Sequence, residues 1–373
     1  MTKPTCRIGA LHIPVAKVRG WAFETVVYDG CREGRAGDAA TAEAYRAHDL
    51  LDDLRGSGLG VFGERREIEI AAKSARFVME DATAGSPPQR IYSAGNSARL
   101  PGTAITSDRP DRWDEVAVGS GAAVEAAANL AIVSDWFLRV HGRRGALGKG
   151  AGMQATVHFG RDYANAFWDG KRLVFGDGIP GRLAPLAAGL DVVAHEFTHA
   201  VSESAAGLGH EGEAGALNEA ISDVFACLVD RDQKKGSAAW TIGEDLLPGR
   251  RGALRDLRDP RRTGGPAHVS EQLFSVEDRG GVHANSAIPA HAAYLMTEGG
   301  ENAVSGLSVD GIGPAAAARI WYRALARYLG PSSEFLDAAE ATATAARDLY
   351  GARSKEYASV VRAWQAVGVL PLG

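Results

Sequence analysis

The sequence has few cysteines, no long hydrophobic run and no excess of positive charge. Its three cysteines, Cys6, Cys31 and Cys227, are too few and odd in number to form a disulfide framework. Any bound metal ion must therefore be held by histidine and carboxylate side chains, although Cys6 could in principle bind one as a thiolate in a latent form. Cys227 falls within a helical pattern and is expected to be a small core residue.

The lack of hydrophobic runs limits where the protein can act. No apolar stretch approaches the roughly 20 residues of a membrane-spanning helix, so we expect no membrane partner. The first 24 residues are interrupted by His12, Pro14 and Lys17, which does not fit a classical signal peptide. We therefore expect a cytoplasmic protein, or one released by a non-classical route. A net charge of −5 argues against nucleic acid as a partner, because a phosphate backbone binds a basic face.

The first part of the chain differs in pattern from the rest. Strand-like runs occur at 24–30 and 66–72, with a charged helical pattern over 39–58. A stretch rich in Gly, Ser and Pro at 82–90 is typical of a linker or an exposed cleavage site. We interpret residues 1–88 as an N-terminal region that could be a propeptide.

The remaining chain predicts two lobes of different composition. Residues 89–190 read as a mixed α/β lobe, with a helix at 122–142 and strands at 153–160 and 171–178. Residues 191–373 read as a central helix followed by a helical lobe. The expected helices lie at about 189–205, 214–231, 284–297, 314–329, 333–350 and 354–367. This order predicts an α+β fold with a cleft at the junction of the lobes.

The stretch "VAHEFTHAV" carries three polar side chains within an apolar helix. His195 and His199 stand at positions i and i+4, so both project from one helix face toward a common point. Two neutral imidazoles in this arrangement can bind one zinc ion, and Glu196 can reach a water on that ion. The alternative is an ordinary amphipathic helix with two hydrogen-bonded histidines.

A further ligand is available on the next predicted helix, "GALNEAISDVFA". Glu219 and Asp223 share one face of this helix, and apolar neighbours indicate that it is buried. Such pairs are usually solvated, but a buried carboxylate pair without a cation is costly. We interpret Glu219 as the third zinc ligand and Asp223 as the acceptor that orients a ligand histidine. Downstream, His283 is a helix cap, a packing residue or a donor to an oxyanion.

Several stretches together resemble the thermolysin-family (M4) zinc metallopeptidases of the gluzincin type. They cover roughly residues 90–371 in the family's order. The matching stretches are "IYSAGNSARLPGT", "NAFWDGKRLVFGDG", "GLDVVAHEFTHAVSESAAGL", "GALNEAISDVFA", "WTIGED", "RGGVHANSAIPAHAAYLM" and "DLYGARSKEYASVVRAWQAVGV". The resemblance implies a two-lobed fold with the zinc site in the cleft between the lobes. The short N-terminal region without a signal peptide is similar to the compact propeptides of the protealysin-like branch.

The resemblance assigns roles to residues at matching positions. It implies one catalytic zinc ion on His195, His199 and Glu219, and a general base at Glu196. Asp223 matches the carboxylate that orients a zinc-bound histidine. The other implied roles are a transition-state donor and its orienting partner (His283, Asp278), substrate main-chain binding (Asn165, Ala166), an arginine near the scissile carbonyl (Arg255) and an S1′ pocket (Leu183, Leu186, Val192, Ile242, Leu246, Leu254).

Two positions depart from the family pattern. His210 stands where the family has an oxyanion-stabilising tyrosine, and it is either a second donor or a loop residue that faces solvent. Of the family's double calcium site, Asp191, Asp230 and Glu244 match. Ala239 and Thr241 replace acidic ligands. We expect at most one calcium ion.

The resemblance implies a zinc-dependent neutral endopeptidase. The aliphatic S1′ positions predict cleavage of a peptide or protein on the amino side of bulky hydrophobic residues. The N-terminal region would act as an intramolecular inhibitor. The alternatives are a non-hydrolytic binding protein that keeps the fold, and a specialised protease dedicated to one substrate.

Overall fold

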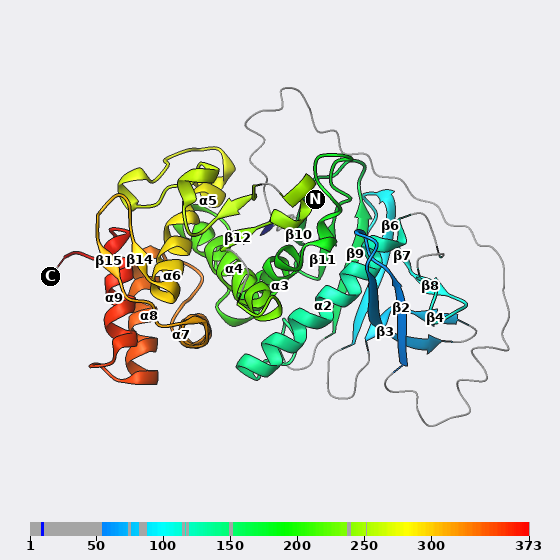
Figure 1. Ribbon diagram of the computed structural model, residues 1–373, viewed down its shortest axis with the longest axis horizontal. Helices are drawn as coiled ribbons and strands as arrows, with labels where there is room; N and C mark the ends of the chain where they lie inside the picture. The colour runs from blue at the N-terminus through cyan, green and yellow to red at the C-terminus, as the bar shows by residue number, and fades with distance from the viewer. Residues whose placement is uncertain are drawn as a thin grey trace, which may run out of the picture.

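The computed structural model describes residues 9–10, 54–73, 76–81, 88–113, 116, 119–148, 152–236, 240–250 and 252–372. Cys6, Cys31 and Ala239 lie outside these residues, as does the expected strand at 24–30. The chain forms sheets on one side and a group of helices on the other, with α3 (Leu190–Ala205) and α4 (Gly212–Gln233) between them (Figure 1). This arrangement confirms the two-lobed α+β fold.

The sheets of the N-terminal lobe contain both strands expected beyond residue 150. The larger sheet has the order β1-β10-β11-β9-β6-β5, with β7 paired to β6. Its strands are β1 (Gly9–Ala10), β5 (Glu80–Asp81), β6 (Gln89–Ser97), β7 (Thr103–Ala104), β9 (Met153–Phe159), β10 (Ala166–Trp168) and β11 (Arg172–Phe175). The second sheet contains β2 (Leu54–Leu59), β3 (Arg65–Lys73), β4 (Arg76–Val78) and β8 (Thr106–Ser107).

The helical pattern over 39–58 is wrong at its C-terminal end. Residues 54–58 belong to strand β2, which pairs antiparallel with β3, and residues 39–53 lie outside the described part of the chain. Gly56 and Gly58 are buried in this strand. A Cβ atom on Gly56 would lie 2.3 Å from the carbonyl oxygen of Pro110, so close backbone packing requires glycine there. Strand β3 confirms the strand expected at 66–72.

Residue 88, the proposed end of the N-terminal region, does not coincide with a break in the fold. Strand β5 pairs with β6 across this position, with Glu80 opposite Arg90. The two side chains also form an ion pair of 2.8 Å. Strands β2 to β5 thus belong to the sheets of the lobe. Where an inhibitory region would end stays a prediction, and residues 82–87 of the expected linker lie outside the described residues.

The helices expected from hydrophobic periodicity are present. They are α2 (Ser120–His141), α3, α4, α5 (Asp278–Asn285), α6 (Ala287–Glu298), α7 (Pro314–Arg327), α8 (Phe335–Tyr350) and α9 (Lys355–Ala366). The single helix expected at 284–297 is instead the end of α5 and all of α6, which meet at Ser286. Short strand pairs join these helices: β12 (Thr241–Ile242) with β13 (Arg255–Asp256), and β14 (Gly300–Glu301) with β15 (Ser308–Val309).

A single hydrophobic cluster extends from the sheet through α2, α3 and α4 into the helical lobe. Phe137 of α2 packs against Phe197 of α3 and Phe225 of α4, with ring centroids 5.3 and 5.5 Å apart. Cys227 is buried in this cluster as a free thiol, as expected. These contacts fix the two central helices against each other. No helix in the described part of the chain is long and apolar enough to cross a membrane.

Candidate metal centre

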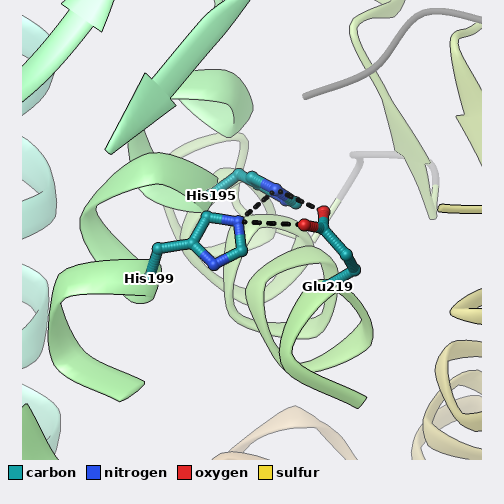
Figure 2. A group of neighbouring side chains, drawn as sticks. All are labelled: His195, His199 and Glu219. Atoms are coloured by element: carbon teal, nitrogen blue, oxygen red, sulfur yellow. Dashed lines mark hydrogen bonds and ion pairs between the residues drawn. The ribbon is translucent and has the colours of Figure 1, made fainter. Parts of the chain in front are cut away.

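Helices α3 and α4 lie side by side and bring three polar side chains to one point. His195 and His199 of α3 face Glu219 of α4, as Figure 2 shows. The three residues are at most 3% exposed. Apolar residues surround them on both helices, so these polar groups sit inside the core that joins the lobes.

The three side chains present their ligand atoms to one another. Nε2 of His195 and Nε2 of His199 lie 3.0 Å apart. The Glu219 oxygens lie 3.3 Å from the first of these nitrogens and 3.6 Å from the second. One ligand atom from each residue falls within 4.8 Å of the others. Two nitrogens and one carboxylate with an open side form the donor set that catalytic zinc prefers.

The far side of each imidazole is held by a hydrogen bond. Nδ1 of His195 lies 2.8 Å from Oδ1 of Asp223, which accepts its proton. Nδ1 of His199 lies 3.1 Å from Oδ1 of Asn218 and 3.2 Å from the hydroxyl of Ser222. With the proton fixed on Nδ1, each Nε2 lone pair is directed at the common point, as in known zinc sites.

The electrostatics also fit a bound cation. Burial lowers the pKa of His199 to about 3, so this imidazole is neutral at pH 7. Burial opposes charge on His195 too, but its hydrogen bonds to Asp223 and Glu219 outweigh burial and raise the pKa of His195 to about 9. Burial would raise the pKa of Glu219, yet the positive charge of His283 and the hydrogen bond from His195 hold it well below its usual range. Without a metal, a proton on His195 balances the buried carboxylates, and a zinc ion can replace it.

Glu196 lies beside this group without contributing a ligand. Its side chain is fully buried, and neither carboxylate oxygen makes a hydrogen bond of good geometry within the described residues. Burial raises the pKa of Glu196 to about 8, and the positive charge of His195 offsets this only in part. A buried, unpaired carboxylate beside three ligand atoms is positioned to exchange a proton with a water at that point.

His283 reaches the same centre from α5. Its Nε2 lies 3.6 Å from Oε1 of Glu219. Oδ1 of Asp278 lies 2.6 Å from Nδ1 of His283, and Oδ2 accepts from its backbone N–H at 3.0 Å. Residues 278–281 all have positive φ, a costly conformation for Asp278 and Arg279 that turns the carboxylate back toward the histidine. The predicted pair of His283 and Asp278 is therefore brought together at the centre.

Arg255 pairs with Asp223 and also borders the cavity beside the centre, and its predicted place near the scissile carbonyl stays a prediction. Its Nε donates to Oδ2 of Asp223 at 2.6 Å, and a terminal nitrogen donates to Oδ1 at 2.5 Å. The same terminal nitrogen lies 3.4 Å from Nδ1 of His195. This forked pair is nearly buried and supports the Asp223 carboxylate beneath the metal centre. His210 is half-buried in the loop between α3 and α4, and its charge is one cause of the low pKa of His199.

The predicted substrate residues lie at the start of β10, which would be the edge strand of the sheet without the two-residue strand β1. Ala166 begins β10, and Asn165 comes directly before it. Strand β10 pairs with β11 on one side and with the short β1 on the other. Oδ1 of Asn165 is buried and makes no hydrogen bond within the described residues. An orphaned carbonyl at a strand edge can accept an N–H from an added peptide strand.

The six aliphatic residues predicted for S1′ join one hydrophobic cluster. Five of them are at most 6% exposed, and Leu254 is half-buried. A cavity of about 560 Å³ opens beside the metal centre, and its wall contains Leu254 and Arg255 on one side and Asp278 and His283 on the other. The five more buried residues do not line this cavity, so only part of the predicted S1′ wall borders open space there.

The residues expected for calcium meet at the C-terminal end of α4. Asp191 lies in the first turn of α3, Asp230 lies near the end of α4, and Glu244 follows β12. The sequence interpretation did not include Lys234, whose ammonium group lies among them. It also missed Asn218 and Ser222. Their signal was their own spacing of four residues, which places Asn218 and Ser222 on one face of the helix, next to the face that carries Glu219.

This site has the features of the H-E-x-x-H class of metallopeptidases. They are a histidine pair on one helix, a carboxylate from the next helix, and a buried glutamate between the two histidines that is not a ligand. The family models agree with this class. The thermolysin metallopeptidase catalytic domain matches residues 55–203, and the alpha-helical domain of the same family matches residues 206–369. The chain therefore belongs to the thermolysin metallopeptidase family.

Individual relatives cover most of this chain. A bacillolysin of Brevibacillus brevis is 42% identical over 334 residues, which are 89% of this chain and 60% of that protein. A thermolysin of Alicyclobacillus acidocaldarius is 42% identical over 318 residues, 84% of this chain and 57% of that protein. The chain thus spans about 60% of the length of these relatives. Among solved structures, the precursor of protealysin, a metalloproteinase from Serratia proteamaculans, matches with a TM-score of 0.64 and 34% identity over 77% of this chain and 88% of that chain.

Proposed function

We propose that this protein is a zinc-dependent neutral endopeptidase that cleaves on the amino side of bulky hydrophobic residues. The observation that carries the proposal is the convergence of His195, His199 and Glu219 beside the unpaired carboxylate of Glu196. The family match supports the same activity. The non-hydrolytic alternative is not favoured, because the three candidate zinc ligands converge next to Glu196 and the family models are those of peptidases.

His195, His199 and Glu219 would hold the zinc ion. When bound, zinc would supply a Lewis acid and would lower the pKa of a water toward about 7. Glu196 takes the proton from the attacking water and returns it to the nitrogen of the departing amine. Burial of Glu196 suits this role, since a carboxylate with a raised pKa both accepts and releases a proton near neutral pH.

The charge that develops on the scissile carbonyl oxygen needs a hydrogen-bond donor. His283 is suited to this role because Asp278 fixes its Nδ1 and directs Nε2 toward the centre. His210 is proposed as a second donor in place of the family tyrosine. Arg255 is proposed as a positioning residue that acts through Asp223 and His195.

Substrate is proposed to add to strand β10. The orphaned Oδ1 of Asn165 would accept a hydrogen bond from an N–H of an extended peptide. The backbone of Ala166 would exchange hydrogen bonds with the same peptide. Leu254 borders the cavity and would form part of the S1′ wall, and the five more buried residues belong to the hydrophobic cluster against which it packs. All six predicted S1′ positions are aliphatic. This favours leucine, isoleucine or phenylalanine after the scissile bond.

The N-terminal region is proposed as an intramolecular inhibitor that uses the same edge. Strand β1 pairs antiparallel with β10, with Gly9 opposite Trp168 and Ala10 opposite Phe167. A strand there takes the backbone edge that a substrate would need. The similarity to a protealysin precursor supports this arrangement.

Intact-mass analysis of purified wild type beside Glu196→Gln tests the proposal. Wild type should cut itself within its N-terminal part, whereas Glu196→Gln should keep full mass and bind zinc. Glu211→Gln, the same change at an exposed position, is the matched control and should behave as wild type. Self-cleavage by Glu196→Gln at the wild-type rate would reject the mechanism.

A peptide library separates a general endopeptidase from a dedicated one. Cleavage of many peptides before leucine, isoleucine or phenylalanine supports the proposed specificity. Cleavage of a single sequence would favour a specialised protease instead. A preference for acidic or basic residues after the scissile bond would contradict the aliphatic pocket.

A further inference from the structure

Three acidic side chains surround one lysine where helix α4 ends, and a fourth lies next to them. Nζ of Lys234 lies 2.9 Å from Oδ2 of Asp230, 3.3 Å from Oε1 of Glu244 and 2.9 Å from Oδ2 of Asp245. Asp191 is buried next to this group, and its charge acts on both Asp230 and Glu244. Three of these acids are the positions at which the family resemblance implies calcium.

The side chains present do not fit a calcium ion. Calcium takes six to eight oxygen ligands at about 2.3–2.6 Å, so it would need the space between Asp230 and Glu244. Nζ of Lys234 occupies that space. Asp191 is also engaged, because Oδ1 accepts the backbone N–H of Val192 at 2.8 Å and Oδ2 accepts that of Gly243. Calcium could bind only if Lys234 withdrew.

We infer that Lys234 takes the place of calcium at this position. Its ammonium group is a covalently tethered cation that joins the end of α4 to the segment that begins at Thr241 and carries Glu244 and Asp245. The fold at this point then does not depend on calcium. This inference concerns stability and does not rest on the proposed peptidase activity.

The position of Lys234 favours this role in two further ways. It follows Asp230 by four residues, so the pair forms between the last turn of α4 and the residue that caps it. It also caps the C-terminal end of α4, where the helix dipole attracts a cation. A tethered ammonium remains in place at any calcium concentration, whereas a bound ion dissociates.

The single positive charge of Lys234 does not neutralise all of the surrounding carboxylates, and the pKa of Asp191 reflects this. Burial, followed by the charge of Glu244, raises the pKa of Asp191 to about 7. The carboxylates around Lys234 hold its pKa well above the usual range for lysine, so it stays charged. A proton on Asp191 thus supplies part of the charge that a divalent ion would bring.

Thermal unfolding with and without calcium tests the inference. Zinc-loaded wild type, Lys234→Ala and Lys234→Gln are compared in calcium-free buffer and at about 10 mM calcium, with magnesium as the ion control. Lys235→Ala is the matched variant, because this neighbouring lysine is exposed. Wild type and Lys235→Ala should shift by less than about 1 °C with calcium. Lys234→Ala should melt lower without calcium and regain about 4 °C or more when calcium is added.

Two results would overturn the inference. One is a gain of several degrees by wild type with calcium but not magnesium. The other is a Lys234→Ala variant that either keeps the wild-type melting temperature or fails to respond to calcium. If Lys234→Ala does not fold, Lys234→Gln carries the same comparison. Calorimetric titration of wild type with calcium gives an independent reading, in which a saturable binding heat contradicts the inference.

Discussion

Replacing Asp223 with asparagine separates two tasks of one buried carboxylate. Asp223 orients His195 through a 2.8 Å bond to Nδ1, and it also neutralises Arg255 through two bonds of 2.5–2.6 Å. Asp223 is 1% exposed and Arg255 is 12% exposed at the side chain. Asparagine keeps the size of the side chain but loses its charge. Both tasks should therefore weaken, and by different amounts.

The two effects have separate magnitudes. Losing the group that orients a ligand histidine typically weakens metal affinity by about 10–100-fold. Leaving a buried arginine without its partner costs about 3–5 kcal/mol of folding free energy. Asparagine can still accept hydrogen bonds, so we expect the loss of folding free energy to lie at the lower end of this range, about 3 kcal/mol. The double variant Asp223→Asn with Arg255→Met should recover most of that stability, because no unpaired charge remains, yet it should keep the weakened zinc affinity.

Zinc affinity is measured by competition with a chelator of known affinity, and stability by urea unfolding of the zinc-free proteins. Asp232→Asn is the matched control: it lies on the same helix, is 38% exposed and pairs with Arg139 at the surface. The control should change neither quantity appreciably. The reasoning is refuted if Asp223→Asn binds zinc as wild type does, or if the double variant recovers zinc affinity along with stability.

Three further outcomes are expected. Glu196→Gln should retain zinc while its kcat falls by about 10²–10⁴-fold, measured on a peptide substrate beside metal analysis; loss of zinc would show that Glu196 is a ligand. His210→Ala should lower kcat by about 10–10³-fold with unchanged zinc content, and an unchanged kcat would place His210 as a loop residue only. Burial raises the pKa of Asp191 from 3.8 to about 7, so the folded protein binds this proton more tightly than the unfolded chain does. Asp191 therefore stabilises the fold below about pH 4, and this stabilisation is lost as pH rises toward 7. The free energy of unfolding of Asp191→Asn should fall less over this pH range than that of wild type. Identical pH profiles of the two proteins would contradict this prediction.

The sequence predicted the metal centre because its signals are local. His195 and His199 are one helical turn apart, and apolar neighbours mark α3 and α4 as buried helices. The helices of the second half were found for the same reason, since their hydrophobic periodicity is regular. The break at Ser286 was missed, although Pro289 signals it. Proline has no N–H to bond the carbonyl of Asn285 and so favours a new helix start just before it.

The features that sequence reasoning missed depend on contacts between distant segments. Arg255 reaches Asp223 over 32 residues because β12 and β13 form a hairpin against α4. Lys234 was overlooked because Glu244 and Asp245, its partners in the next segment, lie 10 and 11 residues further along. At 54–58 a charged pattern favoured a helix, but pairing with β3 and close packing at Gly56 determine a strand.

The central claim, a peptidase that depends on one zinc ion held by His195, His199 and Glu219, is tested most directly by zinc titration. Metal-depleted protein, freed of its N-terminal region if that region inhibits, receives zinc in steps while hydrolysis of a peptide with leucine after the scissile bond is followed. Activity should be absent at the start, rise in proportion to added zinc and level off at about one ion per chain. Full hydrolysis by the metal-free protein, or no hydrolysis at any zinc level, would contradict the account.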